Sequence, residues 1–157
     1  MGNKKAPFNE VKITRTIIEA FNAKLLNCLE SDVLIAGAGP SGLVAARYLS
    51  EAGYKTTIVE KRLAPGGGVW GGGMMMNEAV IQEAAREILA DLNLRTTGKE
   101  KGLFIVDASE LASSLCIKAL KAGATLLNVM SVEDVCVKKG RMTGLVVNRT
   151  TVLGALH

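Results

Sequence analysis

The stretch that most constrains the fold of this chain is residues 32–61, where a glycine-rich turn follows an apolar segment and opens a helical one. An apolar run at 33–36 leads directly into the sequence GAGPSG at 37–42, and a helical segment follows. A second strand is predicted at 55–59, and it ends at Glu60. A strand, a glycine turn, a helix and a strand that ends in an acid form the start of a dinucleotide-binding fold. The order of these segments therefore predicts a parallel α/β core.

Each residue type in this unit has a physical role. Gly37 allows the tight turn from strand to helix, Gly39 lets the backbone approach a pyrophosphate, and Gly42 lets helix and strand pack closely. The phosphates would lie at the helix N-terminus, where unpaired N–H groups and the helix dipole favour negative charge. Glu60 is placed to accept hydrogen bonds from ribose hydroxyls. The pattern predicts an adenosine diphosphate group as ligand and leaves open whether it belongs to NAD or FAD.

Composition and charge favour a single globular domain. The chain has 157 residues, of which 48% are hydrophobic and 22% charged, with a formal net charge of +4. The cations are scattered, which does not favour nucleic-acid binding, and the longest apolar runs are too short to span a membrane. Cys28, Cys116 and Cys136 have no metal-ligand spacing, and we interpret them as buried apolar residues. We expect a cytoplasmic protein with one dinucleotide-binding domain over residues 1–157.

The N-terminal segment combines a polar arm with an amphipathic helix. Residues 1–11 are predicted to be flexible, and a helix is predicted over 12–30 with Thr14 as its N-cap. Its apolar residues at helical spacing are Ile17, Ile18, Phe21, Leu25, Leu26 and Leu29. This apolar face is compatible either with packing against the sheet of the same subunit or with a contact in an oligomer.

The segment GGGVWGGGMMM at residues 66–76 is unusual. Two triple glycines make a regular helix or strand costly, because each glycine loses more backbone freedom than other residues on folding. A flexible linker would favour serine and polar residues, whereas this segment carries Val, Trp and three Met. We therefore expect a loop wrapped around a ligand, with residues 74–76 entering the core or lining a pocket.

The rest of the chain predicts a helix, a strand, a second helix, a strand and a β-hairpin, at residues 78–92, 103–106, 108–121, 125–128 and 132–152. Asp107 is expected to cap the second helix and Lys139-Gly140-Arg141 to form the hairpin turn. The fold class is therefore α/β, a Rossmann-like FAD/NAD-binding fold with a β-hairpin excursion. We expect the chain to be a fragment that ends before the return to the sheet.

Five segments together resemble the N-terminal part of the archaeal sulfide-dependent thiamine thiazole synthases. They are DVLIAGAGPSGL, IVEKRLAPGGGVWGGGM, GLFIVDASELASSL, NVMSVEDV and VVNRTTVLGALH. The resemblance implies an enzyme of thiamine biosynthesis that uses NAD as a substrate. It would form an ADP-linked thiazole carboxylate from NAD, glycine and sulfide with iron(II). It also implies a homo-oligomer, since related enzymes form octamers.

The resemblance also implies residue roles. The dinucleotide-binding positions are Gly37, Gly39, Ser41, Gly42, Glu60, Lys61, Gly68, Val132 and His157. Of these, Lys61 would contact the ligand beside Glu60, Gly68 would lie in the wrapping loop, and Val132 would border the adenine through its backbone.

His157 occupies the position of the sulfur-donating cysteine of the eukaryotic branch, which implies a catalytic position that uses external sulfide. No metal ligand is expected within the chain, because the family's iron ligands lie beyond its last residue. Two alternatives stay open: a FAD-dependent oxidoreductase, which uses the same glycine turn, and a non-catalytic nucleotide-binding remnant.

Overall fold

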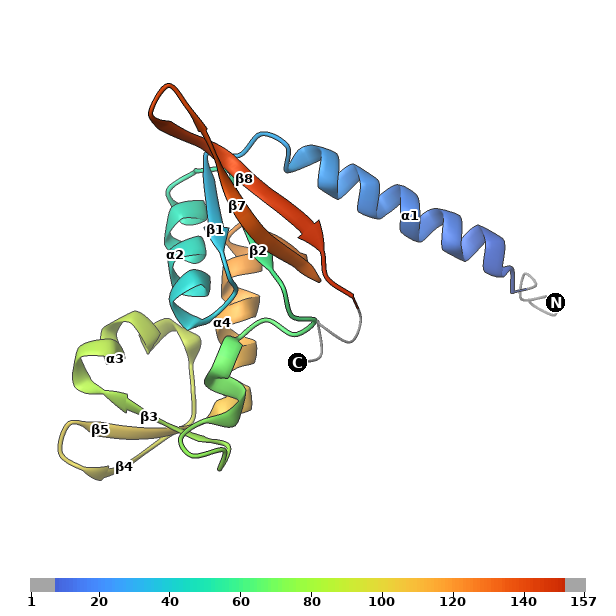
Figure 1. Cartoon of the computed structure of the whole chain (residues 1–157). Helices are drawn as coiled ribbons and strands as arrows, with labels where there is room; N and C mark the ends of the chain where they lie inside the picture. The colour runs from blue at the N-terminus through green and yellow to red at the C-terminus, as the bar shows by residue number, and fades with distance from the viewer. Residues whose placement is uncertain (1–7, 152–157) are drawn as a thin grey trace. The chain divides into compact units, whose positions relative to one another are not determined.

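The computed structural model describes residues 8–151, in which a first unit ends at Glu30 and a second begins at Ser31. The first unit contains α1, Glu10–Asn27 (Figure 1). Its N-cap is Asn9, whose side chain accepts a hydrogen bond from the N–H of Lys12 at 2.9 Å. The predicted cap at Thr14 is therefore wrong, because Asn9 already supplies the acceptor one turn earlier. Residues 10 and 11 of the predicted arm are helical, and residues 1–7 lie outside the described part.

A three-stranded parallel sheet forms the centre of the second unit. Its strands are β1 Val33–Ala36, β2 Thr56–Glu60 and β6 Thr125–Asn128, in the order β1-β2-β6. All five residues of β2 are buried, as expected for the central strand of a parallel sheet. The predicted strands 33–36 and 125–128 are confirmed. Among the described residues, β1 pairs only with β2. That the chain is a fragment, ending before it returns to this sheet, stays a prediction.

Two helices pack against this sheet and against each other. They are α2, Pro40–Glu51, and α4, Ala108–Lys121 (Figure 1). Asp107 caps α4 as predicted, since its carboxylate accepts from the N–H of Glu110 at 2.8 Å. Their common core includes Leu43, Ile58, Val106, Leu111 and Leu115. The predicted α/β Rossmann-like fold is thereby confirmed, while a single domain over residues 1–157 stays a prediction.

A second, antiparallel sheet precedes α4 and departs from the sequence prediction. Its strands are β3 Glu78–Gln82, β4 Thr96–Glu100 and β5 Leu103–Asp107, in the order β3-β5-β4. A helix was predicted over 78–92, but only α3 Glu83–Leu89 and the short 3₁₀ helix η2 Ala90–Leu92 are helical. Residues 78–82 pair with β5 instead, so long-range pairing overrides local spacing. The exposed strand β4 carries no apolar alternation and was missed.

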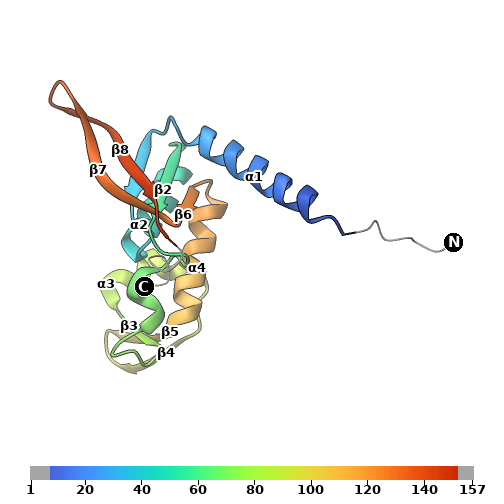
Figure 2. The ribbon, with the colours of Figure 1, turned by 45° about the vertical axis from the view of Figure 1, so that its right-hand side comes forward.

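The predicted hairpin is present. It consists of β7 Met130–Lys138 and β8 Arg141–Arg149, and it extends away from the parallel sheet (Figure 1, Figure 2). Lys139 and Gly140 form its turn with φ of 50° and 74°, the left-handed values that two-residue hairpin turns require. The second strand ends at Arg149, three residues earlier than predicted.

Cysteine burial and helix length bear on two further predictions. Cys28 is buried as predicted, whereas Cys116 and Cys136 are only half-buried, and burial raises the pKa of the Cys116 thiol.

Among residues 8–151, none of the helices combines the length and the apolar character that crossing a membrane would need.

Arg47 links α2 to η2. Its buried guanidinium donates to the Glu51 carboxylate at 2.9 Å and to the Asp91 carboxylate. The hydrogen bond from Arg47 lowers the pKa of Asp91, and its two carboxylate partners raise the pKa of Arg47. This network joins elements that are 44 positions apart in the sequence.

We expect Asp91→Asn to lower the free energy of unfolding at pH 7. Because the pKa of Asp91 is lower in the folded chain, its contribution is present above the ordinary aspartate pKa of about 4 and is lost as pH falls below that value. Urea denaturation at pH 7 and pH 3 measures this, and the gap between wild type and variant should shrink at pH 3. The control Glu87→Gln removes an exposed carboxylate of α3, and an equal effect of both variants would contradict the assignment.

Candidate functional site

The turn between β1 and α2 is held by hydrogen bonds to the end of β2. The N–H of Gly37 donates to the carbonyl of Val59 at 2.8 Å, and the N–H of Ala38 donates to a Glu60 carboxylate oxygen at 2.6 Å. Gly37 has a φ of +97°, which side chains other than hydrogen rarely tolerate. The chain therefore leaves the sheet sharply at Gly37 and enters α2 three residues later.

Gly42 lets the first turn of α2 approach this turn closely. A Cβ built on Gly42 would lie 2.2 Å from the carbonyl oxygen of Gly37 and 3.3 Å from a side-chain carbon of Ile35. Backbone cannot yield to such an overlap as the end of a flexible side chain can. Gly42 is thus required for the packing of helix on strand.

Gly39 faces open space at the N-terminus of α2. A Cβ at this position would meet nothing within 4 Å. Gly39 is the N-cap and provides no side-chain cap, Pro40 follows at the first helical position, and the first turn carries no acidic residue. The first N–H groups of a helix have no partner within it. This end of α2 therefore offers donors and a positive dipole end that no carboxylate of the first turn neutralises.

Glu60 binds the backbone of the turn directly. Its side chain is buried, and its two carboxylate oxygens accept from the N–H of Ala38 at 2.6 Å and from the N–H of Arg62 at 2.7 Å. The sequence pattern predicts a ribose contact for Glu60 and carries no local signal of this structural role. Each carboxylate oxygen has a second lone pair, so the two roles are compatible. The ribose contact stays a prediction.

The glycine-rich segment lies against the same turn. The N–H of Gly66 donates to the carbonyl of Ala38 at 2.7 Å, and a Cβ on Gly67 would come within 3.2 Å of the Gly39 Cα. The Trp70 indole N–H donates to the carbonyl of Pro65 at 2.7 Å. The loop is therefore packed onto the glycine turn by its own backbone.

This segment is more regular than predicted, because Gly67–Gly71 form the 3₁₀ helix η1. Glycines take up the strained positions at its ends, with φ of +115° at Gly66 and +56° at Gly72. A Cβ on Gly72 would lie 2.4 Å from the carbonyl oxygen of Glu78, so this position also needs glycine for space.

The three methionines that follow contradict the prediction that they enter the core or line a pocket. Met74, Met75 and Met76 are 85%, 86% and 68% exposed. Met74, Met75 and Asn77 have φ of 56°, 59° and 61°, a left-handed conformation that directs this short segment outward.

An open hollow of about 530 Å³ lies between the start of α2, η1 and β3. Its lining residues are Pro40, Gly68, Val69, Gly72, Gly73, Ala79 and Val80. A Cβ on Gly68 would meet nothing within 4 Å, so this glycine leaves part of the wall bare. The wall of the hollow consists mainly of main chain and small apolar side chains. Pro40, the first residue of α2, lies at its edge.

The structure brings only some of the predicted site residues to this hollow. Gly68 lines it, and Gly39 and Ser41 flank the lining residue Pro40 in sequence. Exposed Lys61 and half-buried Val132 of β7 are not among its lining residues. His157 lies outside the described residues. Among residues 8–151, no group of three or more His, Cys, Asp or Glu side chains is placed to hold a metal ion.

One contact that sequence reasoning missed supports the segment after Glu60. The Asn128 amide donates to the carbonyl of Leu63 at 2.7 Å, and the Val129 N–H donates to the carbonyl of Arg62 at 3.4 Å. The sequence carries only a weak signal for the contact between Asn128 and Leu63, because these residues are 65 positions apart. The end of β6 therefore helps to fix the chain that leads from β2 into the glycine-rich loop.

We expect Gly42→Ala to lower the free energy of unfolding by about 3 kcal/mol, because its Cβ would overlap the Gly37 backbone. Gly39→Ala is the matched control. Its new Cβ meets nothing within 4 Å, so its effect should stay within about 1 kcal/mol. Urea denaturation of both variants measures the difference, and equal stabilities would contradict the close approach at Gly42.

Comparison with known proteins gives consistent matches along most of the chain. The model of the Thi4 family matches residues 14–157. The chain is 51% identical over 144 residues to a thiamine thiazole synthase of Pyrococcus abyssi, covering 92% of this chain and 57% of that protein. A thiamine thiazole synthase of Thermotoga maritima is 47% identical over 149 residues, with 94% and 59% covered.

Solved structures agree with the sequence matches. The crystal structure of Thermovibrio ammonificans THI4 superposes with a TM-score of 0.89 at 46% identity, covering 94% of this chain and 59% of that one. A 3-ketosteroid dehydrogenase of Rhodococcus jostii RHA1 has a TM-score of 0.62 at 14% identity, which shows the fold alone. The chain spans less than three fifths of the length of these thiazole synthase relatives.

Proposed function

Because this chain belongs to the Thi4 family, we propose that it carries the ADP-binding part of a thiamine thiazole synthase. The proposed reaction forms an ADP-linked thiazole carboxylate from NAD, glycine and sulfide, with iron(II), and NAD is consumed as a substrate. The enzyme is a transferase of thiamine biosynthesis. Relatives with about half of the aligned residues identical carry the name thiamine thiazole synthase, which supports the biosynthetic role.

The observation that carries the proposal is the packing of the glycine-rich loop onto the glycine turn. Gly66 donates to Ala38, and the loop then borders the hollow that begins at Pro40. A pyrophosphate at the edge of this hollow would meet the free N–H groups of α2 and the bare backbone at Gly39 and Gly68. The hydroxyls of the adenosine ribose would then donate to the remaining lone pairs of Glu60.

In this proposal the chain holds a part of the substrate that does not react. The ADP group keeps its bonds while the chemistry takes place at the nicotinamide ribose. Binding energy from such a remote group positions the reacting carbons for the attack of glycine and sulfide. The residues on rigid elements, Gly39 on the α2 cap and Glu60 on β2, therefore act as an anchor.

Iron(II) would supply bound sulfide in such a reaction. The described residues do not fit a metal site, because they hold no group of three or more suitable ligands. No step is therefore assigned to iron, and its ligands are proposed to lie after His157. With histidine at that position, we propose that the sulfur comes from external sulfide. A cytoplasmic homo-oligomer, an octamer as in related enzymes, belongs to the same proposal.

Gly39→Val is expected to weaken binding of ADP-ribose and NAD by about 100-fold, because the side chain would occupy the place of the pyrophosphate. Isothermal titration calorimetry with each ligand measures the affinity. Gly98→Val on β4 is the control, since it adds the same side chain to a strand outside the hollow. Wild-type affinity in a folded Gly39→Val protein would refute the placement of the pyrophosphate.

Glu60→Ala should reduce both ligand affinity and stability. It removes the proposed ribose acceptor and also leaves the N–H groups of Ala38 and Arg62 without their acceptor, which costs about 1–3 kcal/mol each when such groups stay buried. Calorimetry with ADP-ribose and urea denaturation separate the two effects. Glu87→Ala on α3 should change neither, and an unchanged stability of Glu60→Ala would argue against the hydrogen bonds to the turn.

The purified wild-type protein used for calorimetry also tests the alternative of a FAD-dependent oxidoreductase. Purified protein with a flavin absorption band that is released on denaturation would favour that function over thiazole synthesis. Folded protein that binds neither NAD nor ADP-ribose would favour a non-catalytic remnant. The structural neighbours named as FAD-dependent or flavin-dependent are 17% and 18% identical, so they support the fold and not this alternative.

A further inference from the structure

The segment between β2 and the glycine-rich loop is irregular and is held from β6. Residues 61–66 form bends rather than a helix or a strand. The carbonyl of Leu63 accepts from the side-chain amide of Asn128 at 2.7 Å, and the carbonyl of Arg62 accepts from the N–H of Val129 at 3.4 Å. Arg62 and Leu63 are themselves exposed, so packing contributes little to their position. The last residue of β6 and the residue after it therefore fix this segment.

Val129 holds a backbone conformation that its residue type disfavours. Its φ is +59°, in the left-handed region, which is an outlier for a β-branched side chain. Two hydrogen bonds keep it there, because its N–H donates to Arg62 and its carbonyl accepts from the N–H of Thr150 at 3.0 Å. Strained backbone of this kind clusters at ligand sites and switches, where the surrounding structure maintains it. The strain at Val129 thus marks the support of the segment after β2 as a place to look for function.

This support reaches the carboxylate of Glu60. Glu60 and Asn128 are register partners at the carboxyl ends of the parallel strands β2 and β6. One oxygen of Glu60 accepts from the N–H of Ala38 at 2.6 Å, and the other accepts from the N–H of Arg62 at 2.7 Å. The Ala38 donor belongs to the glycine turn, whereas the Arg62 donor belongs to the irregular segment. One of the two bonds that orient the carboxylate therefore depends on the hydrogen bond that Asn128 makes to the next residue.

We propose that Asn128 is a positioning residue for the adenosine ribose and acts through the Arg62 N–H on the Glu60 carboxylate. This role rests on the proposed function, in which the ribose hydroxyls donate to the remaining lone pairs of Glu60. The hydroxyls at C2′ and C3′ need acceptors in fixed directions, because hydrogen bonds weaken steeply when their angle departs from linear. With the Asn128 amide in place, the carboxylate cannot turn about its bond to Ala38. The site then favours a nucleotide that carries both hydroxyls over one that lacks them.

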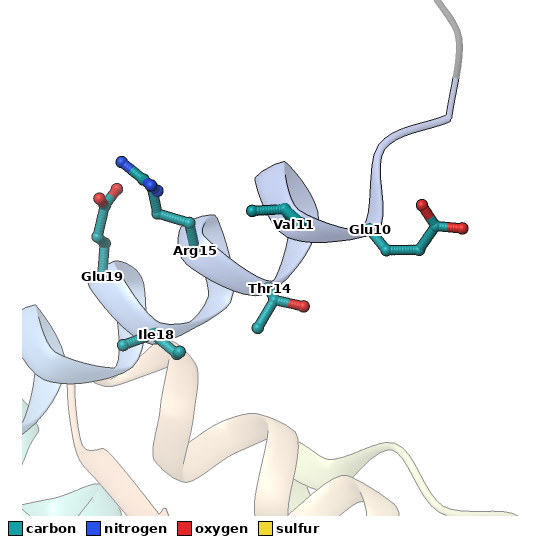
Figure 3. A pocket seen from close by; sticks show the side chains of 6 residues that line it. All are labelled: Glu10, Val11, Thr14, Arg15, Ile18 and Glu19. Carbon is teal, nitrogen blue, oxygen red and sulfur yellow. The ribbon is translucent and has the colours of Figure 1, made fainter.

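A hollow along α1 does not offer a competing site of this kind. It measures about 520 Å³ and is lined by Glu10, Val11, Thr14, Arg15, Ile18 and Glu19. Figure 3 shows these side chains on several sides of one helix, without a common point toward which they converge. Two of them are acids, which repel a diphosphate. Binding of a nucleoside diphosphate is therefore expected to report on the end of β2.

Two nucleotides that differ only in their ribose hydroxyls measure the proposed preference. ADP contains the adenosine ribose alone, and 2′,3′-dideoxy-ADP lacks both hydroxyls. Isothermal titration calorimetry of the full chain should show that wild type binds ADP about 30-fold more tightly than the dideoxy nucleotide. In Asn128→Leu, which removes the amide at similar volume, this preference should fall to about threefold. A merely structural loss would lower both affinities equally and leave their ratio unchanged.

Two further variants separate the hydrogen bond from other effects of the substitution. Asn128→Gln keeps an amide donor, and its preference should stay within about threefold of wild type. Asn128→Asp keeps the shape of asparagine without an N–H donor, so it should lose the preference even if the leucine variant fails to fold. Its added charge acts on the diphosphate of both nucleotides and cancels in the ratio. Asn22→Leu at an exposed position of α1 is the matched control and should leave the preference unchanged.

The possible results distinguish the role of Asn128 from the proposed function. The role of Asn128 is overturned if wild type prefers ADP while folded Asn128→Leu and Asn128→Asp keep that preference. It is also overturned if Asn22→Leu loses as much of the preference as they do. Equal binding of the two nucleotides by wild type would overturn the ribose contact of Glu60 and the role of Asn128 with it. Wild type that binds neither ADP nor ADP-ribose would refute the proposed function itself.

Discussion

The peptide backbone at Ala38 is the point on which the rest of the site depends. Its N–H donates to Glu60 at the end of β2, and its carbonyl accepts from Gly66 in the glycine-rich loop. Ala38 itself is fully buried, so both bonds are shielded from water. The end of β2 and the glycine-rich loop are thereby both held to the glycine turn at one residue. If either hydrogen bond were lost, the buried N–H or carbonyl of Ala38 would be left without a partner, at a cost in stability. The turn, the end of β2 and the loop therefore stabilise one another.

The parts of the fold that were predicted correctly are those with local signals. The turn at Gly37, the cap at Asp107 and the hairpin turn at Lys139-Gly140 each need a particular residue type within a few positions. The pairing of residues 78–82 with β5 could not be read in this way. That segment alternates in burial as a strand does, yet its sequence also matches helical spacing, and the deciding partner lies in a distant part of the chain.

The candidate site likewise combines features that have a local sequence signal with features that depend on distant residues. The need for glycine at position 42 follows from the motif alone, because helix and strand must approach closely. The bond from Glu60 to the turn spans 22 residues, and the support of Leu63 by Asn128 spans 65, so neither has a local signature. Sequence reasoning identified Glu60 as a ligand contact and missed that the same carboxylate first holds the backbone to which a ligand would bind.

The exposed methionines show why hydrophobicity misled at residues 74–76. The position of this segment is set by backbone and amide hydrogen bonds at its ends. Gly73 donates to the carbonyl of Glu78 at 2.7 Å, the carbonyl of Asn77 accepts from Ala108 at 3.0 Å, and its side-chain amide donates to Asp107 at 3.1 Å. These bonds offset the cost of left-handed backbone at Met74, Met75 and Asn77.

The side chains of the loop therefore point where the backbone directs them, even though burial would favour apolar groups inside. The same constraint shapes the hollow, whose wall at Gly68, Gly72 and Gly73 is backbone fixed from both ends. Such a wall gives shape but few polar contacts. A phosphate-bearing ligand placed there would depend on the N-terminus of α2 for its charge, and this explains why the loop must be anchored to the glycine turn rather than merely lie near it.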